Sequence, residues 1–129
     1  MSVSLSFASV ICRDFAALSD FYQRTFALPS VDALSSDYFR GLSIGNTILG
    51  FSAPAAFSLL NIPEVEPPSP PTSFWTFEAD SRGDVDTLTE GAIANGAVCL
   101  RKPAETYYGA WQSVLSDPEG NVFRINRLG

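Results

Sequence analysis

Any chemistry in this chain must proceed without histidine, because none of its 129 residues is a histidine. Two charged side chains stand on otherwise apolar segments, Glu78 and Arg124. The Arg124 guanidinium could bind a carboxylate or phosphate through two parallel hydrogen bonds. The Glu78 carboxylate could hold an amine, pair with Arg124 or act as a general base. A catalytic triad built on histidine is excluded, and the single lysine, Lys102, has no recognisable serine partner.

Aromatic residues could supply the walls of a binding site, since the chain has ten Phe, four Tyr and two Trp. Stacking against a planar or apolar compound is expected of Phe7, Phe74, Tyr107, Tyr108 and Trp111. Other roles stay open for each of them. Phe7 and Phe74 could fill a core, Trp111 could lie in a dimer interface, and the two tyrosines could form either a loop over the site or a simple turn.

Strand alternation predicts which side chains share a face. One face is expected to carry Phe7, Ser9 and Ile11 from a first strand, Phe74, Thr76 and Glu78 from a second, and Val122, Arg124 and Asn126 from a third. The opposite face, with Trp75, Phe77, Phe123 and Ile125, is uniformly apolar and is expected to pack under helices. The mixed face is therefore the predicted binding face.

In the first half of the chain, the pattern predicts elements that would position these residues. Residues 3–12 read as a strand buried on both faces. Asp14 is expected to cap a helix over residues 14–27. A strand over residues 36–44, a Gly45-Asn46 hairpin turn and a strand over residues 47–51 complete this half.

The second half repeats the same order. The pattern predicts a strand over residues 73–79, a helix over residues 83–95 and a strand over residues 97–101 that ends before Pro103. A strand over residues 111–115, a turn over residues 117–121 and a final strand over residues 122–127 follow. Residues 61–71 hold five of the nine prolines and are expected to link two modules, residues 1–60 and 72–129, within one domain.

The two halves can be aligned on each other. Phe7 lies seven residues before Asp14, and Phe74 lies seven residues before Ser81, the two expected helix starts. The segment 45–49 aligns with the segment 120–124, which places Leu49 opposite Arg124. Two copies of a βαβββ unit are the simplest explanation, because one unit alone would leave a sheet face uncovered.

Three segments make the chain resemble the vicinal oxygen chelate superfamily, which includes glyoxalase I, the bleomycin-resistance proteins and the extradiol dioxygenases. They are Asp14 with Phe21-Tyr22, the segment 94–97 (Ala-Asn-Gly-Ala), and the turn 117–121 (Asp-Pro-Glu-Gly-Asn) before an apolar strand. The resemblance implies an α+β fold in which two βαβββ modules curve their mixed sheets around a shared cleft. It also implies a homodimer.

Members of that superfamily that bind a metal place its ligands at four strand positions, which here are Phe7, Leu49, Phe74 and Arg124. None of these side chains offers the imidazole, thiolate or carboxylate that a divalent metal needs. A one-residue slip that exchanges Leu49 for Gly50 changes nothing, because no histidine exists to be found. We therefore expect neither a metal nor a cofactor.

The resemblance and the residues together predict a metal-independent protein of the bleomycin-resistance type, which would sequester an apolar or aromatic compound in a cleft and could confer antibiotic resistance. The expected ligand-binding residues are Phe7, Leu49, Phe74, Thr76, Glu78, Tyr107, Tyr108, Trp111 and Arg124. The alternatives are a lyase- or isomerase-like enzyme that uses Glu78 or a tyrosine as acid or base, and a module whose cleft is filled by its own aromatic side chains.

Charge and composition limit the partners. The net charge of −6 and the pI of about 4.4 disfavour nucleic acid and anionic membrane surfaces as partners. No stretch approaches the length of a membrane span, and the N-terminal residues do not resemble a signal peptide. The two cysteines, Cys12 and Cys99, are expected to be small apolar residues of a reduced, cytoplasmic protein.

Overall fold

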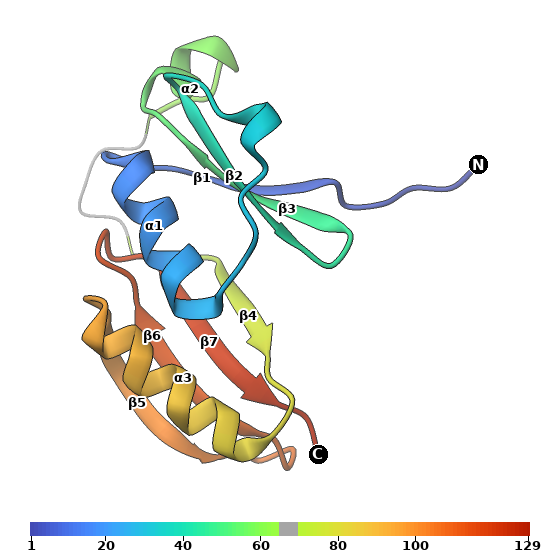
Figure 1. The fold of residues 1–129 in the computed structure, drawn as a ribbon, viewed down its shortest axis with the longest axis vertical. Coiled ribbons are helices and arrows are strands. Elements are labelled where there is room, and N and C mark those ends of the chain that lie inside the picture. Colours follow the sequence, from blue (N-terminus) through green and yellow to red (C-terminus); the bar gives the residue numbers. More distant parts are fainter. Residues whose placement is uncertain (65–69) are drawn as a thin grey trace. The chain divides into compact units, whose positions relative to one another are not determined.

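A computed structural model describes residues 1–64 and 70–129 of the chain (Figure 1). It divides into two compact units, Met1–Pro67 and Pro68–Gly129. The division falls within the proline-rich segment that the sequence marks as a linker, residues 61–71, of which residues 65–69 lie outside the described part. The two units are described separately below.

Unit 1 contains a three-stranded sheet, called sheet 1, and one long helix. Its elements are β1 (Phe7–Ile11), α1 (Phe15–Phe26), a 3₁₀ turn η1 (Asp32–Leu34), β2 (Phe39–Ile44), β3 (Thr47–Ser52) and a short α2 (Ala55–Leu59). The strand order is β1-β3-β2, with β1 parallel and β2 antiparallel to β3. The β2–β3 connection is the expected Gly45-Asn46 turn.

Helix α1 begins and ends where its sequence predicts. The Asp14 carboxylate accepts a hydrogen bond from the backbone N–H of Ala17 at 3.1 Å, which confirms Asp14 as the N-cap. Ala27 at the C-terminal end has a left-handed backbone (φ 52°), and Pro29 follows. The helix buries Phe21 and Tyr22, and the Tyr22 ring stacks on that of Phe51 from β3 at 5.5 Å between centroids.

The first strand is shorter and less buried than its sequence suggests. The predicted strand over residues 3–12 was expected to be buried on both faces, but β1 begins at Phe7 and Phe7 is 43% exposed. The reason is the length of its partner. The partner strand β3 begins only at Thr47, after the hairpin turn, so it cannot pair with residues before Leu5. The Ser6 carbonyl accepts the backbone N–H of Ile48 (2.9 Å), and the residues before Leu5 extend past the sheet (Figure 1).

Unit 1 also has one strand fewer than the βαβββ pattern that was expected. In place of the strand after α1, the described chain makes an isolated bridge between Ser30 and Leu42. Backbone hydrogen bonds from Val31 to Gly41 and from Ser43 to Pro29, both 2.8 Å, flank this bridge. Pro29 has no N–H to donate, and the chain enters η1 directly afterwards, so the pairing cannot extend. Helix α2 was not predicted.

Unit 2 carries the complete pattern. Its elements are β4 (Phe74–Glu78), α3 (Arg82–Ala94), β5 (Val98–Glu105), β6 (Trp111–Ser116) and β7 (Val122–Arg127). They form sheet 2, with strand order β4-β7-β6-β5 and β4 parallel to β7. The Ser81 hydroxyl caps α3 by accepting the N–H of Asp84 (3.0 Å). Two small mixed sheets with one long helix each confirm the predicted α+β fold class of two modules.

Strand β5 passes through Pro103, where the sequence predicted an end. Because β5 lies at the edge of sheet 2, a residue without an N–H is tolerated on its outer side. The register shifts between Cys99 and Arg101 and again between Arg101 and Ala104, so the strand continues as an irregular one. Among the described residues, no helix is long and apolar enough to cross a bilayer.

Candidate ligand-binding faces

Each sheet has one side against its own long helix and one side without such a helix, which we call open face 1 and open face 2. In unit 2 the helix side is defined by direct contacts. Ser113 shares a hydrogen bond with Thr89 of α3 (2.7 Å between hydroxyl oxygens), and Trp111 donates its indole N–H to Asp86 of α3 at 2.9 Å. Phe123 and Ile125 are fully buried on the same side, as predicted.

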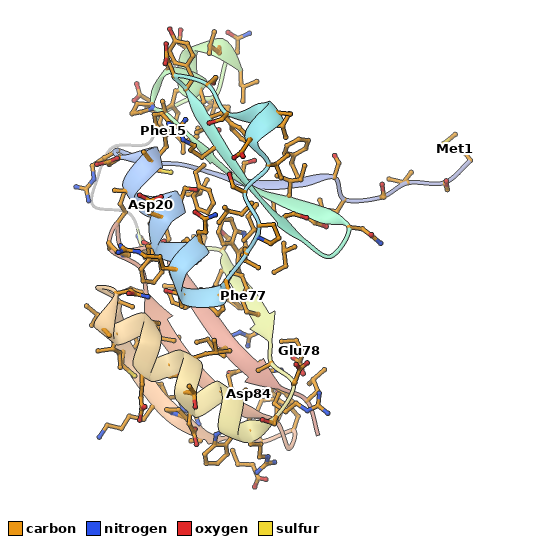
Figure 2. All side chains as sticks on the ribbon, viewed as in Figure 1. Met1, Phe15, Asp20, Phe77, Glu78 and Asp84 are labelled. Atoms are coloured by element: carbon orange, nitrogen blue, oxygen red, sulfur yellow. The ribbon has the colours of Figure 1, made fainter. Side chains whose placement is uncertain are left out.

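Open face 2 therefore carries the alternate residues of the same strands. From β4 these are Phe74, Thr76 and Glu78; from β7, Val122, Arg124 and Asn126; and from β6, Gln112 and Val114. Figure 2 labels Phe77 and Glu78, neighbours on β4 whose side chains lie on opposite faces. Phe74, Thr76, Glu78 and Arg124 were predicted to share a face, and the structure brings these four together.

Open face 1 corrects the predicted register by one residue. Leu49 pairs with Ala8 and Leu42, is only 5% exposed, and lies on the side of sheet 1 that α1 covers. Gly50, its neighbour, pairs with Ser9 on the open face, as Arg124 pairs with Thr76 in unit 2. The predicted register is wrong because the two turns differ in length. Two residues connect β2 to β3, whereas five connect β6 to β7. Gly45 and Gly120, on which the two halves were aligned, are therefore not equivalent.

A phenylalanine that the sequence did not single out covers the centre of open face 1. A Cβ built on Gly50 would lie 2.7 and 2.9 Å from Cε1 and Cζ of Phe39, and would also meet the Ser9 hydroxyl. A Cβ on Gly41, the cross-strand partner of Gly50, would lie 3.2 Å from the same ring. The ring also meets Phe7 edge to face at 6.1 Å. The cross-strand glycine pair was the available signal, because two missing side chains leave room for a ring.

Arg124 is held in a defined pose at the centre of open face 2. Its Nε donates to the Thr76 hydroxyl at 2.9 Å, and its Cζ lies 4.6 Å from the centroid of the Phe74 ring. This is a cation–π contact that fixes the plane of the guanidinium. Phe74 itself remains 54% exposed. The open alternative of an ion pair with Glu78 is not what the structure shows.

Glu78 instead ends a hydrogen-bonded chain across open face 2. Its two carboxylate oxygens accept from Asn126 Nδ2 (2.9 Å) and from the backbone N–H of Leu128 (2.7 Å). Gln112 Nε2 donates both to Asn126 Oδ1 and to the Tyr108 hydroxyl, each at 2.9 Å. Gln112 and Asn126 are almost fully buried. Gln112 was not among the predicted site residues, although a glutamine in a predicted apolar strand was a usable signal.

Besides Leu49, two predicted site residues lie away from the open faces. Trp111 is on the helix side of sheet 2, held by Asp86 and by the Arg82 guanidinium, whose Cζ is 5.3 Å from the ring centroid. Odd-numbered residues of β6 face the helix, so Trp111 lies on the helix side and its neighbour Gln112, which was not predicted, lies on open face 2. Tyr107 is fully exposed and meets only the edge of Tyr108 in the described contacts (5.0 Å).

The tyrosines belong to an ordered turn. Thr106 accepts the N–H of Gly109 and donates its own N–H to Ala110, while its hydroxyl accepts the N–H of Ala110 (3.0 Å). Arg82 ties the turn to α3 through the Gly109 carbonyl (3.2 Å) and Glu105 (3.1 Å). Of the two alternatives for this segment, a fixed turn is observed, and it delivers only Tyr108 to open face 2.

The donor set does not fit a divalent metal. The residues at the corresponding positions of the two sheets are Phe7, Gly50, Phe74 and Arg124, and none supplies a metal ligand side chain. Among the described strand residues, Glu78 is the one carboxylate on open face 2, and its oxygens already accept two N–H groups. Throughout residues 1–64 and 70–129 no cluster of three or more His, Cys, Asp or Glu side chains could hold a metal ion.

Residues 4–125 match the family model described as the Glyoxalase/Bleomycin resistance protein/Dioxygenase superfamily. A crystal structure of a glyoxalase/bleomycin resistance protein/dioxygenase family enzyme from Burkholderia phytofirmans PsJN is similar over 98% of this chain and 100% of that chain, with 38% identity and a TM-score of 0.94.

More distant structures share the fold. Lactoylglutathione lyase from Agrobacterium tumefaciens is 19% identical, with a TM-score of 0.74 over 98% of this chain and 95% of that chain. TioX from Micromonospora sp. ML1 is 17% identical, with a TM-score of 0.67 over 97% of this chain and 98% of that chain. No curated protein matches the chain.

Proposed function

Since this chain belongs to the Glyoxalase/Bleomycin resistance protein/Dioxygenase superfamily, we propose that it is a small-molecule binding protein that needs no metal and sequesters an apolar or aromatic compound. The compound would lie against open face 2. Sequestration makes and breaks no bond, so the donor set described above is sufficient for it. An antibiotic in the cytoplasm is one kind of compound that such a protein would bind.

The observation that carries this proposal is the exposure of aromatic side chains beside fixed polar ones on open face 2. The Phe74 ring is 54% exposed, although it lies in a strand, and Arg124 and Thr76 stand next to it in set positions. A site with an apolar surface and a few fixed polar groups suits small organic molecules. The fully buried residues Phe123 and Ile125 on the other side supply the core, so Phe74 is not needed for it.

A thermal-shift screen of neutral aromatic compounds, followed by calorimetry on each compound that stabilises the protein, tests the proposal. We expect Phe74→Ala to weaken binding about tenfold, since the lost aromatic contact is worth about 1 kcal/mol. Tyr38→Ala removes another exposed aromatic ring, outside both open faces, and should leave binding unchanged. A screen without binders, or equal losses from the two variants, would contradict the proposal.

We also propose that the protein is a homodimer. In the single chain the side chains of Val3 and Leu5 are exposed in the N-terminal segment. Met1 lies at the end of this segment (Figure 2). Such apolar groups are normally covered in the working assembly. Sedimentation at micromolar concentration should give a dimer, and Val3→Ser with Leu5→Ser should shift it toward monomer. A monomer for the unaltered chain would refute this.

Two observations favour specific alternatives. The hydrogen-bonded chain from Tyr108 to Glu78 would suit an enzyme that moves protons, and the Phe39 ring over Gly50 would suit a module whose site is filled by its own side chains. Mass spectrometry separates the first alternative from sequestration, because a bound compound recovered unchanged after long incubation indicates binding without turnover. Failure of every compound to bind would favour the second.

A further inference from the structure

On the proposed function, we infer that the ligand of open face 2 carries a planar carboxylate, which the Arg124 guanidinium binds while the apolar body of the ligand lies against Phe74. The starting point is the hydrogen-bonding capacity left on that face. An arginine has five N–H groups, and Nε of Arg124 uses one on Thr76. The Nη groups of Arg124 have no hydrogen bond or ion pair within residues 1–64 and 70–129.

The other polar groups on the face are already engaged with one another. Both oxygens of Glu78 accept N–H groups, and Gln112 and Asn126 continue the same chain. Glu78 stands two residues from Thr76 on β4, about 7 Å along the strand, yet its carboxylate is bound toward Asn126 and Leu128 rather than toward Arg124. The Glu78 carboxylate therefore does not form an ion pair with the Arg124 guanidinium.

The pose of Arg124 prepares it for a two-oxygen anion. Thr76 holds Nε and the Phe74 ring supports the guanidinium plane, so little side-chain freedom remains to be lost when a ligand binds. The cation–π contact uses no N–H group, which leaves both Nη atoms for the paired hydrogen bonds that a carboxylate accepts.

The surroundings of Arg124 favour an apolar body attached to that carboxylate. Val114 is its cross-strand partner on β6, and Val122, two residues earlier on β7, pairs with Phe74. These three side chains give an apolar surface beside Arg124, and Arg101 of β5, which pairs with Val114 from the other side, adds a second cation at the edge of this face. The chain as a whole has a net charge of −6, which repels anions at long range, but charges farther than about 8–10 Å are largely screened at physiological salt. Recognition would thus depend on contact with Arg124.

Calorimetry with two matched probes tests the inference. Naphthalene-2-carboxylate and naphthalene-2-carboxamide share a ring system and differ in charge. The unaltered protein should bind the carboxylate at least about tenfold more tightly, as expected for charge-assisted hydrogen bonds. Arg124→Gln should abolish this preference and leave carboxamide binding within about twofold. Arg24→Gln, which changes the net charge equally on α1, should keep the preference.

A second variant keeps the test decisive if Arg124→Gln does not fold. Thr76→Val removes the acceptor of Nε at nearly constant volume and should weaken carboxylate binding about threefold without affecting the carboxamide. Equal affinity of the unaltered protein for both probes would overturn the carboxylate inference and leave the proposed function standing. Binding of neither probe would also overturn it, while the proposed function is decided separately by the screen of neutral compounds.

Discussion

The two units have the same strand register but place different side chains on it. The pairs in β1-β3-β2 match those in β4-β7-β6, β5 has no counterpart strand in unit 1, and the helix sides are mainly apolar in both. On the open faces the equivalent pairs are Phe7 and Phe74, Ser9 and Thr76, Ile11 and Glu78, Gly50 and Arg124, Ser52 and Asn126, and Phe39 and Gln112.

This difference shows how one backbone can present a face covered by its own aromatic ring or a face that carries fixed polar side chains. In unit 1 a glycine at the central position lets the ring of Phe39 lie across the sheet. In unit 2 the same position is Arg124, and Gln112 replaces the ring with an amide that connects Tyr108 to Asn126. Polar side chains on such a face are tolerated because each buried one has a hydrogen-bond partner in the described structure.

The largest expected effect concerns the turns that precede β3 and β7. Asp117, almost fully buried, accepts the N–H groups of Glu119 (2.9 Å) and Asn121 (3.0 Å). Asp117→Ala should lower the free energy of unfolding by about 2–4 kcal/mol, because hydrogen bonds to a charged group are lost and donors are left unpaired. Asn46→Ala in the unit 1 turn should cost less than about 1 kcal/mol. Urea denaturation measures both, and similar losses would show that the turns are equivalent.

A smaller effect is expected when unit 1 is changed toward unit 2. Gly50→Ala places a methyl group against Phe39 and should cost about 1–3 kcal/mol. In a Phe39→Ala background the same change should cost at least about 1 kcal/mol less. Gly91→Ala, in α3 with nothing within 4 Å, is the control and should stabilise by about 0.5–1 kcal/mol. Equal costs of Gly50→Ala in both backgrounds would mean that the ring does not occupy this place.

A still smaller loss of stability is expected when the Glu78 charge is removed, which has no counterpart in unit 1 because the equivalent residue is Ile11. Glu78→Gln replaces one acceptor oxygen with an NH₂ group, which cannot accept from both Asn126 and Leu128. The expected loss is about 1 kcal/mol in urea denaturation. Glu90→Gln makes the same charge change on the exposed side of α3 and should stay within about 0.5 kcal/mol. A loss for Glu90→Gln as large as that for Glu78→Gln would point to net charge instead of the hydrogen bonds.

The smallest expected effect is that of added metal, because neither unit offers ligands at the equivalent positions. Zn²⁺ or Ni²⁺ should change the Tm by less than about 1 °C, since only an ion that binds the folded state raises it. Elemental analysis of the purified protein should find no stoichiometric transition metal. A reproducible one-to-one metal content would contradict the assignment of these positions.

Several parts of this molecule could be predicted from local sequence. The cap at Asp14, the Gly45-Asn46 turn and the helix-side set of Phe77, Phe123 and Ile125 follow from neighbours a few residues away. Predictions from the local pattern were wrong where pairing with a distant strand determines the structure. Leu49 was predicted to lie on the same face as Arg124 because the two turns have similar sequences, although they differ in length. The first strand was predicted to begin at residue 3, but β3 has no residues there to pair with it.

The sequence by itself determined the α+β class, the twofold repeat and the lack of histidine ligands, because composition and hydrophobic period depend on residues close together in the chain. Only the tertiary structure decided that Gly50 and not Leu49 stands opposite Ser9, that Phe39 covers Gly50, and that Glu78 accepts hydrogen bonds from Asn126 and Leu128 and not from Arg124. Strand pairing joins segments some 40–50 residues apart, and a one-residue change in a turn moves every following side chain to the other face.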